Sequence, residues 1–328
     1  MMKVRVATHH RRRMALPDMK KFRAELEKSK QEDWDSLHHE TPHRAAVTLF
    51  AVPKPFGSDN DHIQLNAIRS WKQLEPAVEI LLIGNEKGIR EVARDLGVRY
   101  SSDIRYNDHG TPLVNSAFDI ARRDTNTPYL AYINSDIILT PDFVTAMHRL
   151  IDDQRFAQFV AIGKRIDLDV QQEIDFAHPK SLRRLIRDAK SRGRVATQAC
   201  KEYFIFNRDL YQNLPEFAIG RGNWDNWMVY TAKKNRVPVI ETSSLITAVH
   251  QNHDYSHIDA GRYQCYVSGD EASRNMELAG GRHIISGSTP TWRITDRGIR
   301  KEPMLIINPA FWADVPRFSR LVWNLIRS

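Results

Sequence analysis

Cysteine is scarce in this chain, whose 328 residues include only Cys200 and Cys265. Two cysteines cannot build a disulfide scaffold, and the lack of a CxxC pair excludes the common cysteine-based zinc motifs. No apolar run approaches the ~18 residues of a membrane-spanning helix. The basic start of the chain also lacks the apolar segment of a signal peptide. We therefore expect a cytoplasmic protein, either free in solution or docked peripherally on the inner membrane face.

The sequence also lacks the glycine motifs that mark many nucleotide-binding folds. GxxxxGK[ST] is absent, which excludes a P-loop NTPase. The first apolar segment is followed by VPKPFG at residues 52–57 rather than by GxGxxG, so a dinucleotide-binding Rossmann domain is not expected. Neither HExxH nor GxSxG occurs, which argues against zincin metalloproteases and α/β-hydrolases.

The composition that is present suits a folded domain with anionic partners. Hydrophobic residues make up 41% and charged residues 27% of the chain, so a core can form. Lys and Arg exceed Asp and Glu by 48 to 40, a net charge of +8. That excess favours phosphates, nucleotides, nucleic acid or lipid headgroups without choosing among them.

The hydrophobic pattern divides the chain into three parts. Residues 1–44 form a charged N-terminal arm, and residues 45–163 alternate between strand-like apolar runs and helix-like periodic segments. This alternation predicts an α/β fold with a mostly parallel sheet flanked by helices. The predicted catalytic domain extends to residue 260 and includes a basic insertion at 171–200. Residues 261–328 form a C-terminal extension that ends in an amphipathic helix.

Polar residues follow the predicted strands where ligands bind in open α/β sheets. Such a rim suits a phosphate-bearing ligand and a hard cation. The candidates are Pro53 and Lys54 after the first strand, Glu86 after the second, Asn134, Ser135 and Asp136 after the fourth, and Lys164 and Arg165 after the fifth.

Two later clusters add catalytic side chains. Asp225 lies at the start of a predicted helix and is flanked by Trp224 and Trp227. A carboxylate between aromatic rings suits a sugar site, with a base for a hydroxyl and a stacking surface for the ring. The alternatives are purely structural roles: Asp225 as a helix N-cap and the tryptophans as core residues. A histidine cluster, HQNHDYSH at residues 250–257, follows a predicted strand.

The order of these features resembles a GT-A-fold, family-2-like glycosyltransferase over residues 45–257. The stretches YINSDIIL, FAIGRGNWDNW and HQNHDYSH are also similar to nucleotide-diphospho-sugar transferase-like proteins. The resemblance implies a nucleotide-sugar donor bound by residues 45–163 and a saccharide or glycolipid acceptor bound by residues 164–260. It also implies Mn²⁺ or Mg²⁺ held by Asp136 and His250, and a hexosyl transfer with inversion in which Asp225 is the base.

The chain departs from that family at Asn134, which replaces the first acid of the usual Asp-x-Asp motif. The literal Asp-x-Asp, Asp167-Leu168-Asp169, comes one unit later and remains an alternative. Cations such as Lys54 or Arg165 are an alternative way to neutralise phosphate, and which of His250, His253 and His257 acts stays open.

Three other functions compete with the transferase. One is a catalytically silent protein that binds nucleotide-sugar or acts as a scaffold. Another is a nucleic-acid-binding protein, which is not expected because no recognised binding motif is present. The third is a sugar-nucleotidyltransferase, which usually has a Gly-rich basic loop that residues 52–57 match poorly.

Overall fold

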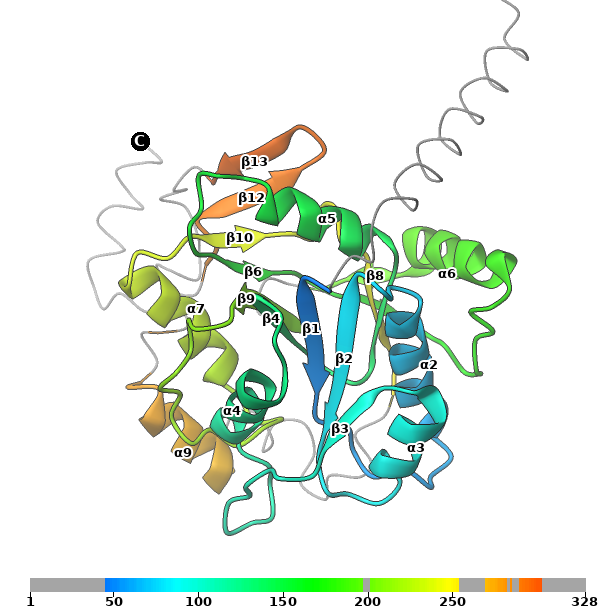
Figure 1. Cartoon of the computed structure of the whole chain (residues 1–328), viewed down its shortest axis with the longest axis horizontal. Coiled ribbons are helices and arrows are strands. Elements are labelled where there is room, and N and C mark those ends of the chain that lie inside the picture. Colours follow the sequence, from blue (N-terminus) through cyan, green and yellow to red (C-terminus); the bar gives the residue numbers. More distant parts are fainter. Residues whose placement is uncertain (1–44, 197–200, 254–268, 282–283, 285–288, 303–328) are drawn as a thin grey trace, which may run out of the picture. The chain divides into compact units, whose positions relative to one another are not determined.

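The computed structural model describes residues 45–302 except 197–200, 254–268, 282–283 and 285–288. Within these residues the chain forms two sheets and seven helices of eight or more residues (Figure 1). The N-terminal arm, Cys200, Cys265, His257 and the C-terminal amphipathic helix of the sequence analysis lie outside the described residues.

Nine strands form the larger sheet, which is parallel except at β9 and β13. This topology confirms the predicted α/β fold with a mostly parallel sheet. In spatial order the strands are β13 (Gly298–Lys301), β12 (Trp292–Thr295), β10 (Val239–Glu241), β6 (Val160–Ile162), β9 (Tyr203–Asn207), β4 (Tyr129–Ile133), β1 (Val47–Ala51), β2 (Val78–Ile83) and β3 (Arg99–Ser101).

Helices cover both faces of this sheet, which explains why its central strands are continuously apolar. Leu49 of β1 belongs to a core with α2 (Asp61–Lys72), α3 (Ile89–Leu96) and α5 (Asp142–Ile151). The next residue, Phe50, belongs to a second core with α4 (Val114–Asp124), α7 (Trp224–Lys234) and the end of α9 (Asp270–Leu278). Successive side chains of a strand point to opposite faces, so one strand serves both cores.

The smaller sheet was not foreseen from the sequence. Its four strands run in the order β5 (Ile137–Leu139), β11 (Ala248–Gln251), β7 (Ile166–Leu168) and β8 (Arg194–Val195). A helix, α6 (Pro179–Arg192), packs Leu185 and Ala189 on it and closes a small third core. In its described residues, the predicted insertion at 171–200 therefore supplies the edge strand β8 of this sheet and the helix α6 that covers it.

The chain changes sheets through short polar connections. Residues 134–136 join β4 to β5, and residues 163–165 join β6 to β7. Gly163 is required at the second junction, because a Cβ there would stand 1.8 Å from the Tyr203 hydroxyl. The sequence pattern treated residues 164–169 as one strand end, which is wrong because Ile166–Leu168 forms a strand of the other sheet. It also left residues beyond 260 unassigned, where α9, β12 and β13 occur.

Candidate metal centre and its surroundings

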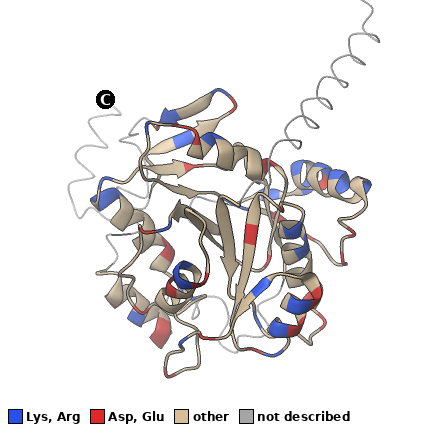
Figure 2. Ribbon diagram, viewed as in Figure 1, with Lys and Arg blue, Asp and Glu red and all other residues tan. Residues whose placement is uncertain are grey.

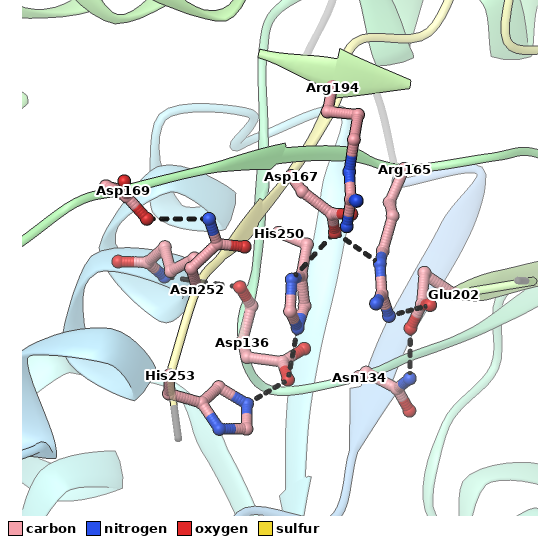
Figure 3. A network of polar contacts seen from close by, with 11 residues as sticks. Asn134, Asp136, Arg165, Asp167, Asp169, Arg194, Glu202, His250, Asn252 and His253 are labelled. Atoms are coloured by element: carbon pink, nitrogen blue, oxygen red, sulfur yellow. Dashed lines mark hydrogen bonds and ion pairs between the residues drawn. The ribbon is translucent and has the colours of Figure 1, made fainter. Parts of the chain in front are cut away.

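Three ligand-type side chains meet at the junction between the two sheets (Figure 3). The Nε2 atoms of His250 and His253 lie 3.5 and 3.3 Å from the same carboxylate oxygen, Oδ2 of Asp136. Asp136 follows β4, whereas His250 lies on β11 and His253 follows it. In the part of the chain that the structure describes, this is the one cluster of at least three such residues close enough to share an ion.

The spacing and the donor atoms fit a divalent ion. Ligands on neighbouring corners of an octahedral ion, each at ~2.1 Å, stand about 3 Å apart, close to the separations seen here. The other oxygen of Asp136, Oδ1, is buried and has no hydrogen-bond partner among the described residues. A buried carboxylate oxygen without a partner is costly unless a cation or water satisfies it. The residues therefore fit a metal ion.

The Asp136 carboxyl group has the negative charge that a metal ligand needs. Burial alone raises the pKa of Asp136, but contacts with the imidazoles of His250 and His253 outweigh it and hold that pKa well below its ordinary value. Asp136 is thus ionised at neutral pH, as a metal ligand must be.

A second carboxylate, Asp167, supports His250 from behind. Asp167 and His250 are register partners on the parallel strands β7 and β11, and Nδ1 of His250 lies 3.1 Å from Oδ1 of Asp167. When an ion binds Nε2, a carboxylate in that place would keep the remaining imidazole proton on Nδ1. Asp167 thus contacts His250 and is not one of the three clustered ligands. This arrangement differs from the alternative in which Asp167-Leu168-Asp169 binds the metal.

Arg165 connects this support to a buried acid. Its guanidinium bonds Asp167 at 2.7 Å and also pairs with Glu202. Burial raises the pKa of Asp167, but Arg165 outweighs that effect and lowers it. For Glu202 burial prevails over Arg165, and its pKa is raised. Asn134 donates to Glu202 at 2.6 Å, so its amide points away from the cluster.

The loop after β1 lies beside the same junction. Gln64 accepts from the backbone N–H of Lys54 at 2.8 Å and from the Ser135 hydroxyl at 3.0 Å. One buried amide therefore ties the Pro53-Lys54 segment to the Asn134–Asp136 segment. Pro53 is buried, and Lys54 is exposed.

Glu86 is held one strand further along. Its Oε1 accepts from the Tyr106 hydroxyl at 3.0 Å, while its Oε2 is buried without a partner among the described residues. The structure gives it no contact with the junction residues above. Lys164 lies at the junction, where its backbone N–H donates to Ser243.

Asp225 belongs to a different element, helix α7. It lies in the first turn of α7, whose N-cap is Asn223, so Asp225 is not itself the cap. The ammonium of buried Lys201 lies 3.9 Å from Asp225 and donates to Asn226 at 2.9 Å. Because Lys201 precedes Glu202 in the chain, the Asp225 region and the Arg165 network are joined through two consecutive residues.

Trp224 is a core residue in this arrangement. Its side chain is 7% exposed and packs on Tyr132 and Phe204 with ring centroids at 5.1 and 5.5 Å. Trp227 is partly buried against Phe217. Both tryptophans therefore pack against the core, which was the alternative to a sugar-stacking role.

Sequence reasoning missed Gln64, Lys201 and Glu202. Gln64 carried a signal, because it is a polar residue among the apolar positions Ile63, Ala67 and Ile68 of α2. Lys201 and Glu202 carried none, since no local pattern marks a charged pair that becomes buried before a strand.

Comparisons with known proteins return distant structural likenesses. No family model matches the sequence, and no curated protein matches it. The chain is similar to a mannosyltransferase from Pyrobaculum calidifontis in complex with GDP-Man and Mn²⁺, with 12% identity, 72% of this chain and 68% of that chain covered, and a TM-score of 0.43. It is also similar to glucosyl-3-phosphoglycerate synthase from Mycobacterium tuberculosis in complex with Mn²⁺, UDP and phosphoglyceric acid. The identity is 16%, the match covers 73% of this chain and 80% of that chain, and the TM-score is 0.43. A third similar structure is S. aureus TarS 1–349 in complex with UDP-GlcNAc. The identity is 11%, the match covers 37% of this chain and 35% of that chain, and the TM-score is 0.29. At these scores the likenesses carry no argument about function.

Proposed function

We propose that the protein is a metal-dependent glycosyltransferase that moves a sugar from a nucleoside-diphosphate sugar to an acceptor hydroxyl. The observation that carries the proposal is the convergence of Asp136, His250 and His253 on one point beside the ends of β4 and β1. Ligands of open α/β sheets bind at such strand ends. This position also matches the sequence resemblance to GT-A-fold glycosyltransferases.

The metal centre would hold Mn²⁺. Two imidazoles and one carboxylate suit a first-row transition ion better than Mg²⁺, which prefers oxygen ligands and keeps several waters. An ion bound there would neutralise charge on the diphosphate of the donor. Asp167 would orient His250 as a ligand, and Gln64 would hold the Lys54 loop beside the donor.

Asp225 is the proposed base for the acceptor hydroxyl. It is a carboxylate in the first turn of α7 with a buried cation, Lys201, close by. Base catalysis from the side opposite the leaving group inverts configuration at the anomeric carbon. Residues 45–163 and 164–260 would form the donor and acceptor sides, with the metal ligands drawn from both. The expected products are a polysaccharide, glycolipid or other glycoconjugate.

Calorimetry with the full chain tests the donor site. Titrations with UDP and GDP, each with and without Mn²⁺ or Mg²⁺, are expected to show binding that needs Mn²⁺. Asp136→Asn should abolish the metal-dependent part, whereas Asp169→Asn should leave it intact, because exposed Asp169 is bonded to Asn252 and not to the cluster. Binding of no nucleotide under any condition would contradict the proposal, and loss in Asp169→Asn alone would move the ion to the later motif.

Turnover of the base variant tests the chemistry. Asp225→Asn keeps the shape and the Lys201 contact but removes the base, so sugar transfer should fall ~100- to 10,000-fold while donor affinity is unchanged. Nucleoside diphosphate released from a panel of nucleotide sugars measures it, with exposed Asp119→Asn as the matched control. Unchanged turnover in Asp225→Asn would remove Asp225 from this role. Donor binding without any transfer by the unsubstituted protein would favour the silent, nucleotide-sugar-binding alternative.

A further inference from the structure

Helix α6 has a charge distribution unlike that of the other helices (Figure 2). Helices α3 and α4 mix acids and bases, as in Arg90, Glu91, Arg94 and Asp95 of α3. The sequence of α6 instead has six basic residues and one acid. The basic residues are Lys180, Arg183, Arg184, Arg187, Lys190 and Arg192, and the acid is Asp188.

Five of these cations share one face of the helix. At 100° per residue, Lys180, Arg183, Arg184, Arg187 and Lys190 fall within an arc of about 120°, and all five are exposed. Leu185 and Ala189, which pack on the smaller sheet, lie on the opposite face. The helix is therefore fixed to the fold by its apolar side, and its cations point outward together.

Neutralisation within the protein is incomplete. Asp188 forms ion pairs with Arg184, Arg187 and Arg192 at 3.7, 3.4 and 2.8 Å. Within the described residues, Lys180, Arg183 and Lys190 have no carboxylate within 4 Å. A solvated helix face needs no such excess of one sign, and like charges at helical spacing repel one another. An anionic partner would relieve that repulsion.

The chain that follows α6 leads back to the surroundings of the candidate metal centre. Gly193 ends α6, and the next residue, Arg194, reaches back to Asp167 at 3.3 Å. Asp167 in turn contacts His250.

We propose that the exposed face of α6 docks the protein on an anionic phospholipid bilayer. The five cations span about 15 Å of helix and lie in one arc, so all can face a flat layer of phosphates. Half-buried Ile186 lies at the edge of this arc, beside Arg183, Arg187 and Lys190. No aromatic residue occurs in α6 to stack on bases, as single-stranded nucleic acid binding requires.

Vesicle co-sedimentation of the full chain tests the proposal. Vesicles of phosphatidylcholine with about one third phosphatidylglycerol should bind the protein, vesicles of phosphatidylcholine alone should not, and raised salt should release it. Changing Arg183, Arg187 and Lys190 to Gln should weaken vesicle binding about a hundredfold, because each basic residue near the surface contributes roughly fivefold.

A dispersed triple variant is the matched control. Arg94→Gln, Lys234→Gln and Lys301→Gln removes the same charge from exposed positions on other elements, and vesicle binding should change far less. The milder double variant Arg183→Gln with Lys190→Gln should give an intermediate loss, which keeps the test valid if the triple variant misfolds. UDP and Mn²⁺ binding, measured separately, reports on the donor site, so failure of the docking surface and failure of the proposed function are distinguished.

Three outcomes would overturn the docking surface. One is no binding to anionic vesicles, and another is an equal loss in the α6 and dispersed triple variants. The third is α6-dependent binding of RNA or DNA without vesicle binding, which would make nucleic acid the partner of this face.

Discussion

The two sheets of this protein bury different chemistry. The larger sheet buries apolar strands between two layers of helices, as in Leu49 and Phe50 of β1. The smaller sheet buries charged and polar side chains, among them Asp167, His250 and Gln251. Its apolar core, on the α6 side, is much smaller. The comparison teaches that stability and chemistry are divided between the sheets, and that the candidate site lies where the chain passes from one to the other.

Truncating one leucine in each sheet should expose the largest difference. Leu49→Ala should lower the free energy of unfolding by ~2–5 kcal/mol, since Leu49 is fully buried among many apolar neighbours. Leu168→Ala should cost less, because Leu168 is in the small core under α6 and that core can relax. Urea unfolding followed by circular dichroism measures both. Equal losses would mean that the smaller sheet is as cooperative a part of the fold as the larger one.

Removing the partner of His250 should change metal binding more than folding. Asp167→Asn weakens the hold on the imidazole proton, so affinity for Mn²⁺ should fall ~10- to 100-fold. Calorimetric titration with Mn²⁺ alone measures it, and Asp169→Asn is the control on the same segment. The thermal unfolding of each variant identifies any general loss of structure. An unchanged Mn²⁺ affinity in Asp167→Asn would show that Asp167 does not orient His250.

An acid outside the smaller sheet should affect stability alone. Glu271 of α9 accepts from Asn107 and from Arg221, each at 2.7 Å. Burial raises the pKa of Glu271, but these hydrogen bonds outweigh it and hold the pKa below its ordinary value of 4.5.

A lowered folded-state pKa means that the contribution of Glu271 is present above pH 4.5 and is lost as pH falls through the folded value. Glu271→Gln should therefore be less stable than the unsubstituted protein at pH 7, and the difference should shrink toward about pH 3. Urea unfolding at both pH values measures it, with Mn²⁺ affinity at neutral pH expected to stay constant. A stability difference that does not depend on pH would contradict the assignment.

Most elements of the larger sheet could be predicted from local pattern. The run at 45–52 and the periodic segments that became α2 and α7 contain their own signals, because buried parallel strands and amphipathic helices are coded by neighbouring residues. The smaller sheet could not be predicted in this way. Its strands have two to four residues and pair across long separations, such as β5 with β11. No local periodicity encodes that pairing.

The candidate site divides along the same line. Asp136 and His250 could be named from the sequence because each is a chemically apt residue after or within a predicted strand. The choice of His253 as their companion, and the role of Asp167 behind His250, depended on the register between β7 and β11. Arg165 was an alternative cation for a phosphate, which stays a prediction, and its pairing with Asp167 and Glu202 could not be read from the sequence.

Within the described residues, no helix is both long and apolar enough to cross a membrane. The predicted cytoplasmic location stays a prediction.

The sequence by itself determined an α/β fold, its central strands and the residue types available for chemistry, because local hydrophobic spacing decides secondary structure and burial. Only the tertiary structure decided which of those residues meet. Asp136 lies more than a hundred positions before His250 and His253 in the chain, and the three form a site because β5 and β11 pair in one register. A shift of one residue in that register would turn His250 to the opposite face of the sheet.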